Sequence, residues 1–359
     1  MPNSRKPLET TTLGSFPKPA YVPVRDWFDI ARETGGMSSS RTTLDYTADT
    51  QKSDASREAL FIRAAKEVIE IQLRTGITIP TDGEVRRENY IHYHCRHLDG
   101  FDFTNLEHRV LRDGAYETDL PAIREPIRHK GKLYGAHDYL ASQGVSPRPV
   151  KFTLPGPLTI MDTTADCFYD NRPKLNAILA ETVNQEILGL VDAGCQYIQV
   201  DEPVFARAVD DALSFGMDGL ERCFHGVPNS VTRIVHMCCG YPDYLDDVDY
   251  QKADPNSYHR LASAIDSAAF DQISIEDAHC CNELDLLEKF QSKTVIFGAV
   301  AIASSRIESV EEVASRLTSV LEHIDRDRLV VAPDCGLGLL PADLAEAKLQ
   351  VMCDAAALV

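Results

Sequence analysis

Four residues that commonly bind zinc stand at or just past the ends of three short β-branched segments. His236 and Cys238 follow TRIV, Glu276 follows DQISI, and Cys335 comes shortly after RLVVA. Thiolates and imidazole favour Zn²⁺, and a carboxylate completes a four-coordinate site. Because strand side chains alternate between faces, His236 and Cys238 are expected to point the same way. The pattern predicts a zinc site at these four residues; the alternative is that they are buried core residues.

The segments that must position these ligands alternate between strand-like and helix-like along almost the whole chain. The predicted strands are residues 10–14, 77–82, 150–153, 197–201, 232–236, 272–275, 294–298 and 329–332. The predicted helices are residues 56–74, 174–193, 257–269, 281–291, 310–323 and 342–356, with a capping box at Ser309 and Glu312. Such alternation implies a parallel sheet, and eight repeats imply closure. We therefore predict an α/β fold, a single (β/α)₈ TIM barrel forming one domain over residues 1–359.

Two segments interrupt this alternation. Residues 21–55 are polar and contain GGMSSSRTT, which suggests a loop over the barrel mouth. Residues 101–147 contain short alternating runs around Arg112-Asp113-Gly114 and Lys130-Gly131-Lys132. Asp-Gly and Lys-Gly between such runs favour hairpins, so an inserted hairpin segment is expected after the second strand.

Composition narrows the class of function. The formal net charge of −19 argues against nucleic acid and anionic membranes as partners. No apolar run approaches the ~18 residues of a membrane span, and the first residues do not resemble a secretion signal. The ten cysteines are therefore expected to be thiols and metal ligands of a cytoplasmic protein.

Polar groups follow most of the predicted strands. Ser15 follows the first strand, Glu84 follows the second, and Asp201 ends the fourth. In barrels of this kind the active site lies at the carboxyl ends of the strands. These residues are therefore expected to converge with the predicted zinc ligands at one mouth, although any single acid could be a solvated loop charge.

Seven motifs in order resemble the catalytic barrel of cobalamin-independent methionine synthase. They are TTLGSFPKP, TDGEVRREN, LPGPLT, IQVDEPVFAR, VHMCCG, ISIEDA and PDCGLG, and they span nearly the whole chain. The resemblance is to the short members that lack the N-terminal folate-gripping barrel. It implies that His236, Cys238, Glu276 and Cys335 bind Zn²⁺. It also implies that Ser15, Glu84 and Asp201 hold the amino and carboxylate groups of homocysteine.

The resemblance and the chemistry together predict methyl transfer to a thiol. Metal coordination deprotonates a thiol, and a catalytic zinc needs an open position. Glu276 is the ligand expected to leave when the substrate sulfur enters, so Glu276 and Asp201 are the predicted catalytic residues. Carboxylates at Glu84 and Asp201 suit an ammonium group and would repel a sulfonate.

The sequence departs from the folate-using members at two positions. The folate-stacking tryptophan position holds Thr163, and the proposed general-acid histidine position holds Ala303; the single tryptophan is Trp27. Methyltetrahydrofolate is therefore doubtful as the donor, and a methyl-corrinoid protein or another methyl donor is at least as well supported.

Three further features each allow more than one interpretation. His92, His94 and His97 are predicted as a second metal site, as polar lining of the mouth or as helix surface. Arg86 and Arg87 are predicted to bind a substrate carboxylate or to form surface ion pairs. Of the adjacent cysteine pairs, Cys239, Cys280 and Cys281 are interpreted as packing residues.

The favoured function is a zinc-dependent methyltransferase that converts homocysteine to methionine. The main competing function is that of a thiol alkyltransferase or lyase of the epoxyalkane:coenzyme M transferase type, to which the wider family extends. A barrel with structural zinc and a metal-free decarboxylase of the uroporphyrinogen type are two weaker candidates. The decarboxylase would not need His236, Cys238 and Cys335 together.

Overall fold

The structure is a computed structural model that describes residues 7–34, 39–49, 55–111, 116–247, 249–254 and 256–359. Seven parallel strands form a curled sheet in the order β1-β10-β9-β8-β7-β6-β4. Their bounds are β1 (Glu9–Thr10), β4 (Lys151–Pro155), β6 (Tyr197–Asp201), β7 (Thr232–Met237), β8 (Gln272–Ile275), β9 (Thr294–Val300) and β10 (Leu329–Pro333). The strand prediction is confirmed for six of these segments, with shifted ends in four of them, whereas the strand predicted at residues 10–14 overlaps β1 only at Thr10.

The predicted second strand, residues 77–82, is only partly strand-like. Ile79 forms an isolated parallel bridge to Thr11, and Thr81 forms one to Lys151. The segment therefore lies between β1 and β4, the two edges of the sheet. Pro80 has no N–H for a ladder, and the Gln72 side chain bonds both the N–H and the carbonyl of Thr81, each at 2.9 Å. The proline prevents a regular strand ladder here, and the Gln72 amide satisfies the backbone groups of Thr81 instead.

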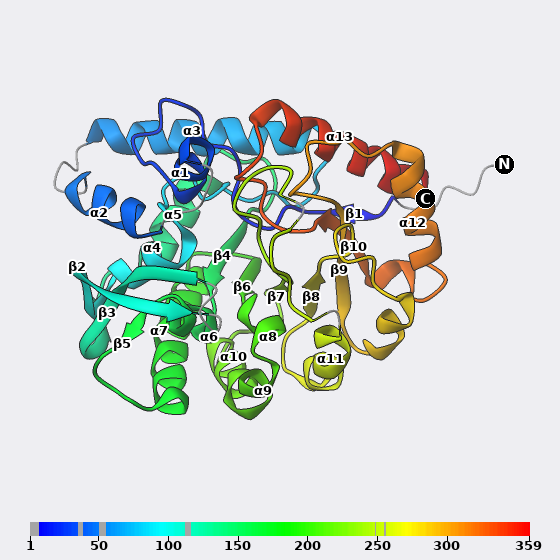
Figure 1. Cartoon of the computed structure of the whole chain (residues 1–359). Helices are drawn as coiled ribbons and strands as arrows, with labels where there is room; N and C mark the ends of the chain where they lie inside the picture. The colour runs from blue at the N-terminus through cyan, green and yellow to red at the C-terminus, as the bar shows by residue number, and fades with distance from the viewer. Residues whose placement is uncertain (1–6, 35–38, 50–54, 112–115, 248, 255) are drawn as a thin grey trace.

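Helices surround the sheet. Figure 1 shows α3 and α13 along one side of the molecule and α7, α8 and α11 along the opposite side, with the strands between them. The helix bounds are α1 (Trp27–Thr34), α2 (Ser39–Asp49), α3 (Ala55–Arg74), α4 (Tyr90–Arg96), α5 (Tyr134–Gln143), α6 (Pro157–Asp162), α7 (Arg172–Asp192), α8 (Val204–Arg207), α9 (Val209–Asp211), α10 (Met217–Cys223), α11 (Ser257–Ser267), α12 (Val310–Val320) and α13 (Ala342–Leu358). A π-helical turn, η3 (Ala212–Gly216), and two 3₁₀ turns, η4 (Leu284–Lys289) and η5 (Arg326–Arg328), complete the helical elements.

Local sequence signals explain several of these boundaries. Ser309 and Glu312 form the predicted capping box at the start of α12. Asn171 caps α7, where Lys174 N donates to Asn171 Oδ1 at 3.0 Å. Every residue of β4 and β10 is buried, because both faces of these strands are covered. The sequence of β10 is accordingly a continuous apolar run. The helix predicted at residues 281–291 is wrong, because only the 3₁₀ turn η4 forms there.

The first interrupting segment is not a loop, as predicted, but carries two helices. Within residues 21–55, α1 and α2 form, while residues 35–38 and 50–54 lie outside the described part of the chain. Phe28, Ile30 and Ala31 of α1 are buried. The polar composition of this segment led to the loop prediction, but α1 has one apolar face. That face packs at the end of the sheet where the strands finish.

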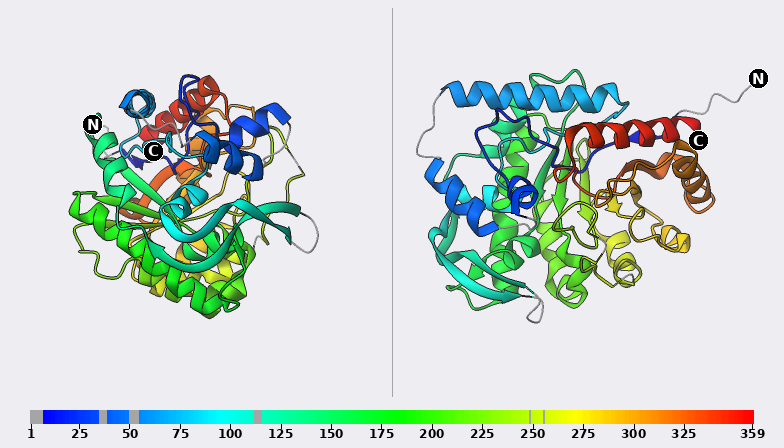
Figure 2. Two further views of the ribbon diagram at one scale, coloured as in Figure 1. Left: turned by 90° about the vertical axis from the view of Figure 1, so that its left-hand side faces the viewer. Right: turned by 45° about the horizontal axis from the view of Figure 1, so that its top comes forward.

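The second interrupting segment contains two long antiparallel strands, β2 (Leu98–Leu111) and β3 (Tyr116–His129). The short strand β5 (Ala165–Asp166) joins β3 in parallel. Figure 2 shows this teal ribbon projecting past the helices. The predicted Arg112-Asp113-Gly114 turn lies entirely outside the described residues. The hairpin expected at Lys130-Gly131-Lys132 is wrong, because helix α5 follows it.

In the part of the chain that the structure describes, no helix combines the length and the apolar character needed to cross a membrane.

Candidate active site

A cavity of about 240 Å³ opens at the carboxyl ends of the strands. Six of the seven predicted site residues line it, namely Ser15, Glu84, Asp201, His236, Cys238 and Cys335. Glu276 is not among the described residues that line the cavity. The convergence arises because parallel strands end at the same edge of the sheet. Further lining residues are Leu13, Trp27, Phe28, Asn89, Tyr90, Ile91, His92, Leu120, Thr159, Asp162, Thr163, Pro203, Val204, Arg207, Gly240, Tyr241, Asp243 and Gly336.

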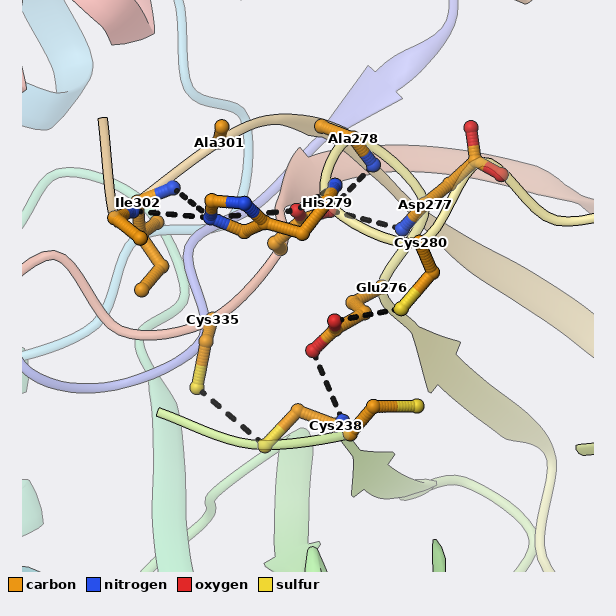
Figure 3. Close-up of polar contacts among 12 residues, drawn as sticks. Cys238, Glu276, Asp277, Ala278, His279, Cys280, Ala301, Ile302 and Cys335 are labelled. Atoms are coloured by element: carbon orange, nitrogen blue, oxygen red, sulfur yellow. Dashed lines mark hydrogen bonds and ion pairs between the residues drawn. The ribbon is translucent and has the colours of Figure 1, made fainter. Parts of the chain in front are cut away.

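His236, Cys238 and Cys335 form a compact triangle on the cavity wall. His236 lies on β7, Cys238 just after it and Cys335 just after β10. His236 Nε2 is 3.3 Å from Cys335 Sγ, and Cys335 Sγ is 3.8 Å from Cys238 Sγ (Figure 3 draws the sulfur pair). The ligand atoms of all three lie within 4.8 Å of one another. His236 and Cys238 therefore face the same way, as strand alternation predicts.

This triangle has the dimensions of a tetrahedral zinc site. Zn–S bonds of about 2.3 Å and Zn–N bonds of about 2.05 Å at tetrahedral angles separate two sulfurs by roughly 3.8 Å, and sulfur from nitrogen by roughly 3.6 Å. The other imidazole nitrogen, His236 Nδ1, is 3.0 Å from Ser274 Oγ, which orients the ring. The hydrogen bond to Cys335 and burial raise the pKa of Cys238 well above its usual range. Two adjacent thiolates therefore need a compensating cation.

Glu276 follows β8 and is held in a second cluster with Cys239 and Cys280. Glu276 Oε2 accepts from Cys239 N at 2.9 Å, and Glu276 Oε1 accepts from Cys280 Sγ at 2.7 Å. Lys252 Nζ is 3.6 Å from Oε1. Figure 3 shows the Glu276 carboxylate near the sulfur pair, with dashed lines to Cys280 and to the backbone nitrogen that follows Cys238. In this arrangement both carboxylate oxygens are engaged outside the triangle.

Asp334, within the motif PDCGLG, organises the loop after Glu276, a role that the sequence did not predict. Its carboxylate accepts hydrogen bonds from the backbone N–H groups of Asp277, Ala278 and His279, at 2.8–2.9 Å. Figure 3 shows the three donor residues, Asp277, Ala278 and His279, together on this loop. Asp334 directly precedes Cys335. Its hydrogen bonds therefore hold the loop after Glu276 next to the strand end that bears Cys335.

Glu84 and Asp201 place two buried carboxylates in the same cavity. Thr153 Oγ1 donates to Glu84 Oε1 at 2.8 Å, and Gln199 Nε2 donates to Asp201 Oδ1 at 2.7 Å. Burial raises the pKa of Glu84 to about 7, although Arg87 opposes the shift. Burial likewise raises the pKa of Asp201 to about 6, against the effect of His236. Two acids destabilised by burial form a site for an incoming cation.

The backbone at Glu84 is unusual, since its φ of 57° lies in the left-handed region. The neighbouring Gly14 has φ 139°, and a Cβ added there would lie 2.8 Å from Glu84 Oε1. Glycine at this position therefore leaves the space that the Glu84 carboxylate occupies. Glu202, the second acid of DEP, accepts from Leu158 N and Thr159 N at the start of α6 instead.

We expect Gly14→Ala to lower the free energy of unfolding by roughly 1–3 kcal/mol and to weaken ammonium binding by displacing Glu84. The matched control is Gly131→Ala, since Gly131 also has a positive φ, 83°, but has no atom within 4 Å of an added Cβ. Denaturant unfolding and substrate titration of both variants separate backbone strain from displacement. Equal effects of the two substitutions on substrate affinity would contradict the steric argument.

The histidine-rich segment lies on and just after α4, with His92 and His94 buried and His97 partly buried. His92 lines the cavity, whereas His97 stacks on Tyr134 with ring centroids 4.4 Å apart and His94 Nδ1 is 3.1 Å from the Tyr134 hydroxyl. Among the described residues, these three histidines belong to neither group with metal-binding spacing. Only His92 thus fits the predicted polar lining, and the helix-surface interpretation is wrong.

Burial also corrects the interpretation of the arginine pair and of Cys281. Arg86 and Arg87 are both buried, so the surface ion-pair interpretation is wrong, and neither lines the cavity. Arg87 Nη1 donates to the Thr153 carbonyl at 3.0 Å and contacts Glu84. Cys281 is exposed rather than packed, because strand β8 has already ended and the chain turns there with φ 49°.

The two positions that depart from the folate-using pattern lack the expected chemistry in space as well. The Thr163 side chain donates to the Thr159 carbonyl at 2.8 Å, at the end of α6. Ala303 is buried, and its N–H donates to His279 Nε2 at 3.0 Å (Figure 3 shows His279). Trp27, which sequence reasoning left without a role, lines the cavity together with Phe28, which sequence reasoning missed. Because Trp27 is the only tryptophan of the chain, its presence was the sequence signal that could have pointed to this part of the cavity.

Comparisons with known proteins agree with this architecture. A family model described as the catalytic domain of cobalamin-independent synthase matches residues 8–358. The methionine synthase of Sulfolobus acidocaldarius is 29% identical over 342 residues, covering 95% of this chain and 89% of that protein. The methionine synthase of Saccharolobus solfataricus is 28% identical over 348 residues, covering 96% and 92%.

Solved structures show the same resemblance. A B12-independent methionine synthase from Shewanella sp. W3-18-1, solved in complex with selenomethionine, superposes with a TM-score of 0.82 and 27% identity and covers 98% of both chains. A putative B12-independent methionine synthase from Listeria monocytogenes, at 16% identity and TM-score 0.69, shares the fold over 99% of this chain and 98% of that one. Because the family model matches nearly the whole chain, this protein belongs to the family of cobalamin-independent methionine synthase catalytic domains.

Proposed function

We propose that this protein is a zinc-dependent S-methyltransferase that converts homocysteine to methionine. The observation that carries the proposal is the His236–Cys238–Cys335 triangle in one cavity with the buried acids Glu84 and Asp201. The proposal takes the fold as a (β/α)₈ barrel acting as one domain, with residues 77–82 as its second strand and β2–β3 as an inserted hairpin.

His236, Cys238 and Cys335 would hold Zn²⁺, which lowers the pKa of a coordinated thiol and keeps it as a thiolate. Glu276 would be the labile fourth ligand. Its partners Cys239 N, Cys280 and Lys252 give the carboxylate a stable position away from the triangle. This leaves room for the substrate sulfur beside Cys238 and Cys335.

The remaining residues would orient the amino acid. Glu84 and Asp201 accept the ammonium group, and Ser15, whose hydroxyl lies against Gly336, contacts the carboxylate end. The same acids disfavour the sulfonate of coenzyme M, so the epoxyalkane:coenzyme M transferase function is less well supported. Isothermal titration of zinc-loaded protein with homocysteine and with coenzyme M tests this choice. Tighter binding of coenzyme M would reverse it.

Thiol consumption, product mass and metal analysis test the central proposal together. Zinc-loaded protein supplied with homocysteine and a panel of methyl donors is expected to form methionine, and protein stripped of zinc is expected not to. The methyl-corrinoid donor stays a prediction and belongs in that panel, as does methyltetrahydrofolate. Full activity after complete zinc removal would exclude the proposed chemistry.

The affinity for the amino-acid group is expected to depend on pH through Glu84. Its pKa of about 7 means that the carboxylate is ionised above that pH and protonated below it. Only the ionised form attracts an ammonium group, so affinity should fall as pH drops, by at most about tenfold per unit for one proton. Methionine is the best probe, because it has no thiol to titrate.

Calorimetry with methionine and zinc-free protein, between about pH 5 and about pH 8, measures this dependence without competing metal chemistry. The Glu84→Gln variant should bind more weakly at high pH and lose the step near pH 7, and the dependence that remains near pH 6 belongs to Asp201. A wild-type affinity that stays constant across this range would contradict the role assigned to Glu84.

A further inference from the structure

Four aromatic rings form a connected wall along the cavity. The Trp27 ring centroid lies 5.7 Å from that of Phe28 and 6.1 Å from that of Tyr90, and the Phe28 centroid lies 5.5 Å from that of Tyr241. All four residues line the cavity that contains the sulfur pair. They come from α1, the start of α4 and the segment after β7, so three parts of the chain contribute to one surface.

This wall reaches the reacting end of the cavity. The Tyr241 hydroxyl donates to the carbonyl of Gly336, the residue after Cys335, at 2.8 Å. Burial raises the pKa of Tyr90 well above its usual range, and the charges of Asp201 and Cys238 add to this effect. Both tyrosines are therefore neutral and lie close to the acids and sulfurs. A group held against these rings would face the position proposed for the homocysteine sulfur.

The charges that line the cavity favour a cation. Besides Glu84 and Asp201, the acids Asp162 and Asp243 line it. Among the described lining residues Arg207 is the one arginine or lysine, and its Nη2 pairs with Asp162 Oδ2 at 3.3 Å. An anionic donor such as a folate, with its glutamate carboxylates, would meet this acidic surface. The cavity volume of about 240 Å³ is also below the roughly 300–1,000 Å³ of pockets for drug-sized ligands.

Besides the proposed zinc ligand His236, the described lining of the cavity holds one histidine, His92, and two acids of raised pKa, Glu84 and Asp201, which the bound homocysteine ammonium would keep ionised. None of these is the proton donor that a pterin nitrogen requires. His92 Nε2 is 3.1 Å from the Thr163 carbonyl, to which it must donate, and Nδ1 is 3.0 Å from the Thr43 hydroxyl. Burial lowers the pKa of His92 to about 4, so its ring is neutral. Ala303 has no ionisable group. A suitable donor must therefore release its methyl group without taking up a proton.

We propose that the methyl donor is a small onium cation, a sulfonium or a quaternary ammonium, bound against the Trp27, Phe28, Tyr90 and Tyr241 rings. Aromatic faces attract such cations, and the four acids of the described lining outnumber its one arginine and the homocysteine ammonium together. The inference rests on the proposed methylation of homocysteine and names the second substrate of the same site.

The methyl transfer balances without an added proton. The homocysteine thiolate sulfur forms a bond to the methyl carbon as the bond from that carbon to the onium sulfur or nitrogen breaks. The electron pair of the broken bond stays on the donor atom, which leaves as a neutral thioether or tertiary amine. The positive charge of the donor and the negative charge of the thiolate disappear together.

Binding can be measured without catalysis, because Trp27 is the only tryptophan of the chain. Choline is expected to change the tryptophan fluorescence saturably, and its neutral isostere 3,3-dimethylbutan-1-ol should bind about 2- to 30-fold more weakly. Tyr90→Leu should reduce this preference for the cation, and Tyr90→Phe, which keeps the ring face, should retain it. Equal binding of the two probes, or no saturable binding of choline, would overturn the proposal.

Turnover identifies the donor and separates the two proposals. Zinc-loaded protein with homocysteine receives methyl-labelled S-methyl-L-methionine, glycine betaine, methylcobalamin or methyltetrahydrofolate in separate reactions. At least one onium donor is expected to yield labelled methionine at least about 100-fold faster than methyltetrahydrofolate, which lacks its proton donor here. Methionine formed only from methylcobalamin or methyltetrahydrofolate would overturn the onium proposal and leave the methyltransferase proposal standing. No methionine from any donor, with no binding of homocysteine, would overturn both.

Discussion

Replacing Cys335 with serine is expected to weaken Zn²⁺ binding by roughly 100-fold and to remove methyl transfer at ordinary zinc concentrations. A structural zinc site contributes about 10–16 kcal/mol, so each of four ligands accounts for about 3 kcal/mol. A neutral hydroxyl cannot replace a thiolate, and Cys335 forms two edges of the triangle with His236 and Cys238. Competition with a chromophoric chelator measures the zinc affinity directly.

The matched control for this variant is Cys195→Ser. Cys195 is buried, whereas Cys335 is partly buried, and the Cys195 sulfur contacts the Tyr197 carbonyl at 3.3 Å, away from the cavity. The control should retain zinc affinity and turnover, while its stability reports the cost of a buried hydroxyl. Undiminished zinc affinity in Cys335→Ser would show that the triangle is not the metal site.

Replacing Asp201 with asparagine is expected to weaken homocysteine binding by about 10- to 150-fold while zinc content is retained. A hydrogen bond to a charged group contributes about 1.5–3 kcal/mol, and 1.4 kcal/mol corresponds to a factor of ten. Asparagine preserves the shape of the side chain and removes its charge. Calorimetric titration of zinc-loaded protein with homocysteine gives the affinity, and metal analysis gives the zinc content.

Asp162→Asn serves as the control for charge at the cavity. Asp162 lines the same cavity but is paired with Arg207 at 3.3 Å. It should leave homocysteine affinity nearly unchanged, because the proposed ammonium position lies at Glu84 and Asp201. Unchanged homocysteine affinity in Asp201→Asn would remove that carboxylate from the binding model, and loss of zinc would give it a structural role.

The resemblance of this chain to its family extends over 98% of the Shewanella structure, yet the two donor-related positions hold Thr163 and Ala303. In the proposed reaction, the shared architecture would serve the thiol substrate, and the two changed positions would affect the methyl donor. The triangle and the acid pair would bind the thiol substrate, whereas the aromatic wall would bind the methyl donor. Measurements on the thiol and on the donor are therefore independent tests.

The sequence by itself determined most of the sheet. Residues 197–201 and 272–275 were predicted as strands and form β6 and β8 with those bounds. These strands are buried on both faces, so each is a short β-branched run whose signal is local. Six predicted site residues line one cavity, and the sequence predicted this from the ends of the strands alone, because parallel strands end at one edge of the sheet. They are Ser15, Glu84, Asp201, His236, Cys238 and Cys335.

Only the tertiary structure decided the features that depend on distant segments. The Gln72 side chain on α3 forms hydrogen bonds with the backbone N–H and carbonyl of Thr81. The Asp334 carboxylate accepts a hydrogen bond from the loop that follows Glu276. The orientation of Glu276 toward Cys280 depends on which loops meet. The aromatic wall unites α1 and α4 with the segment that follows β7. Hydrophobic periodicity records whether a residue is buried, but it carries no information on which remote side chain lies opposite.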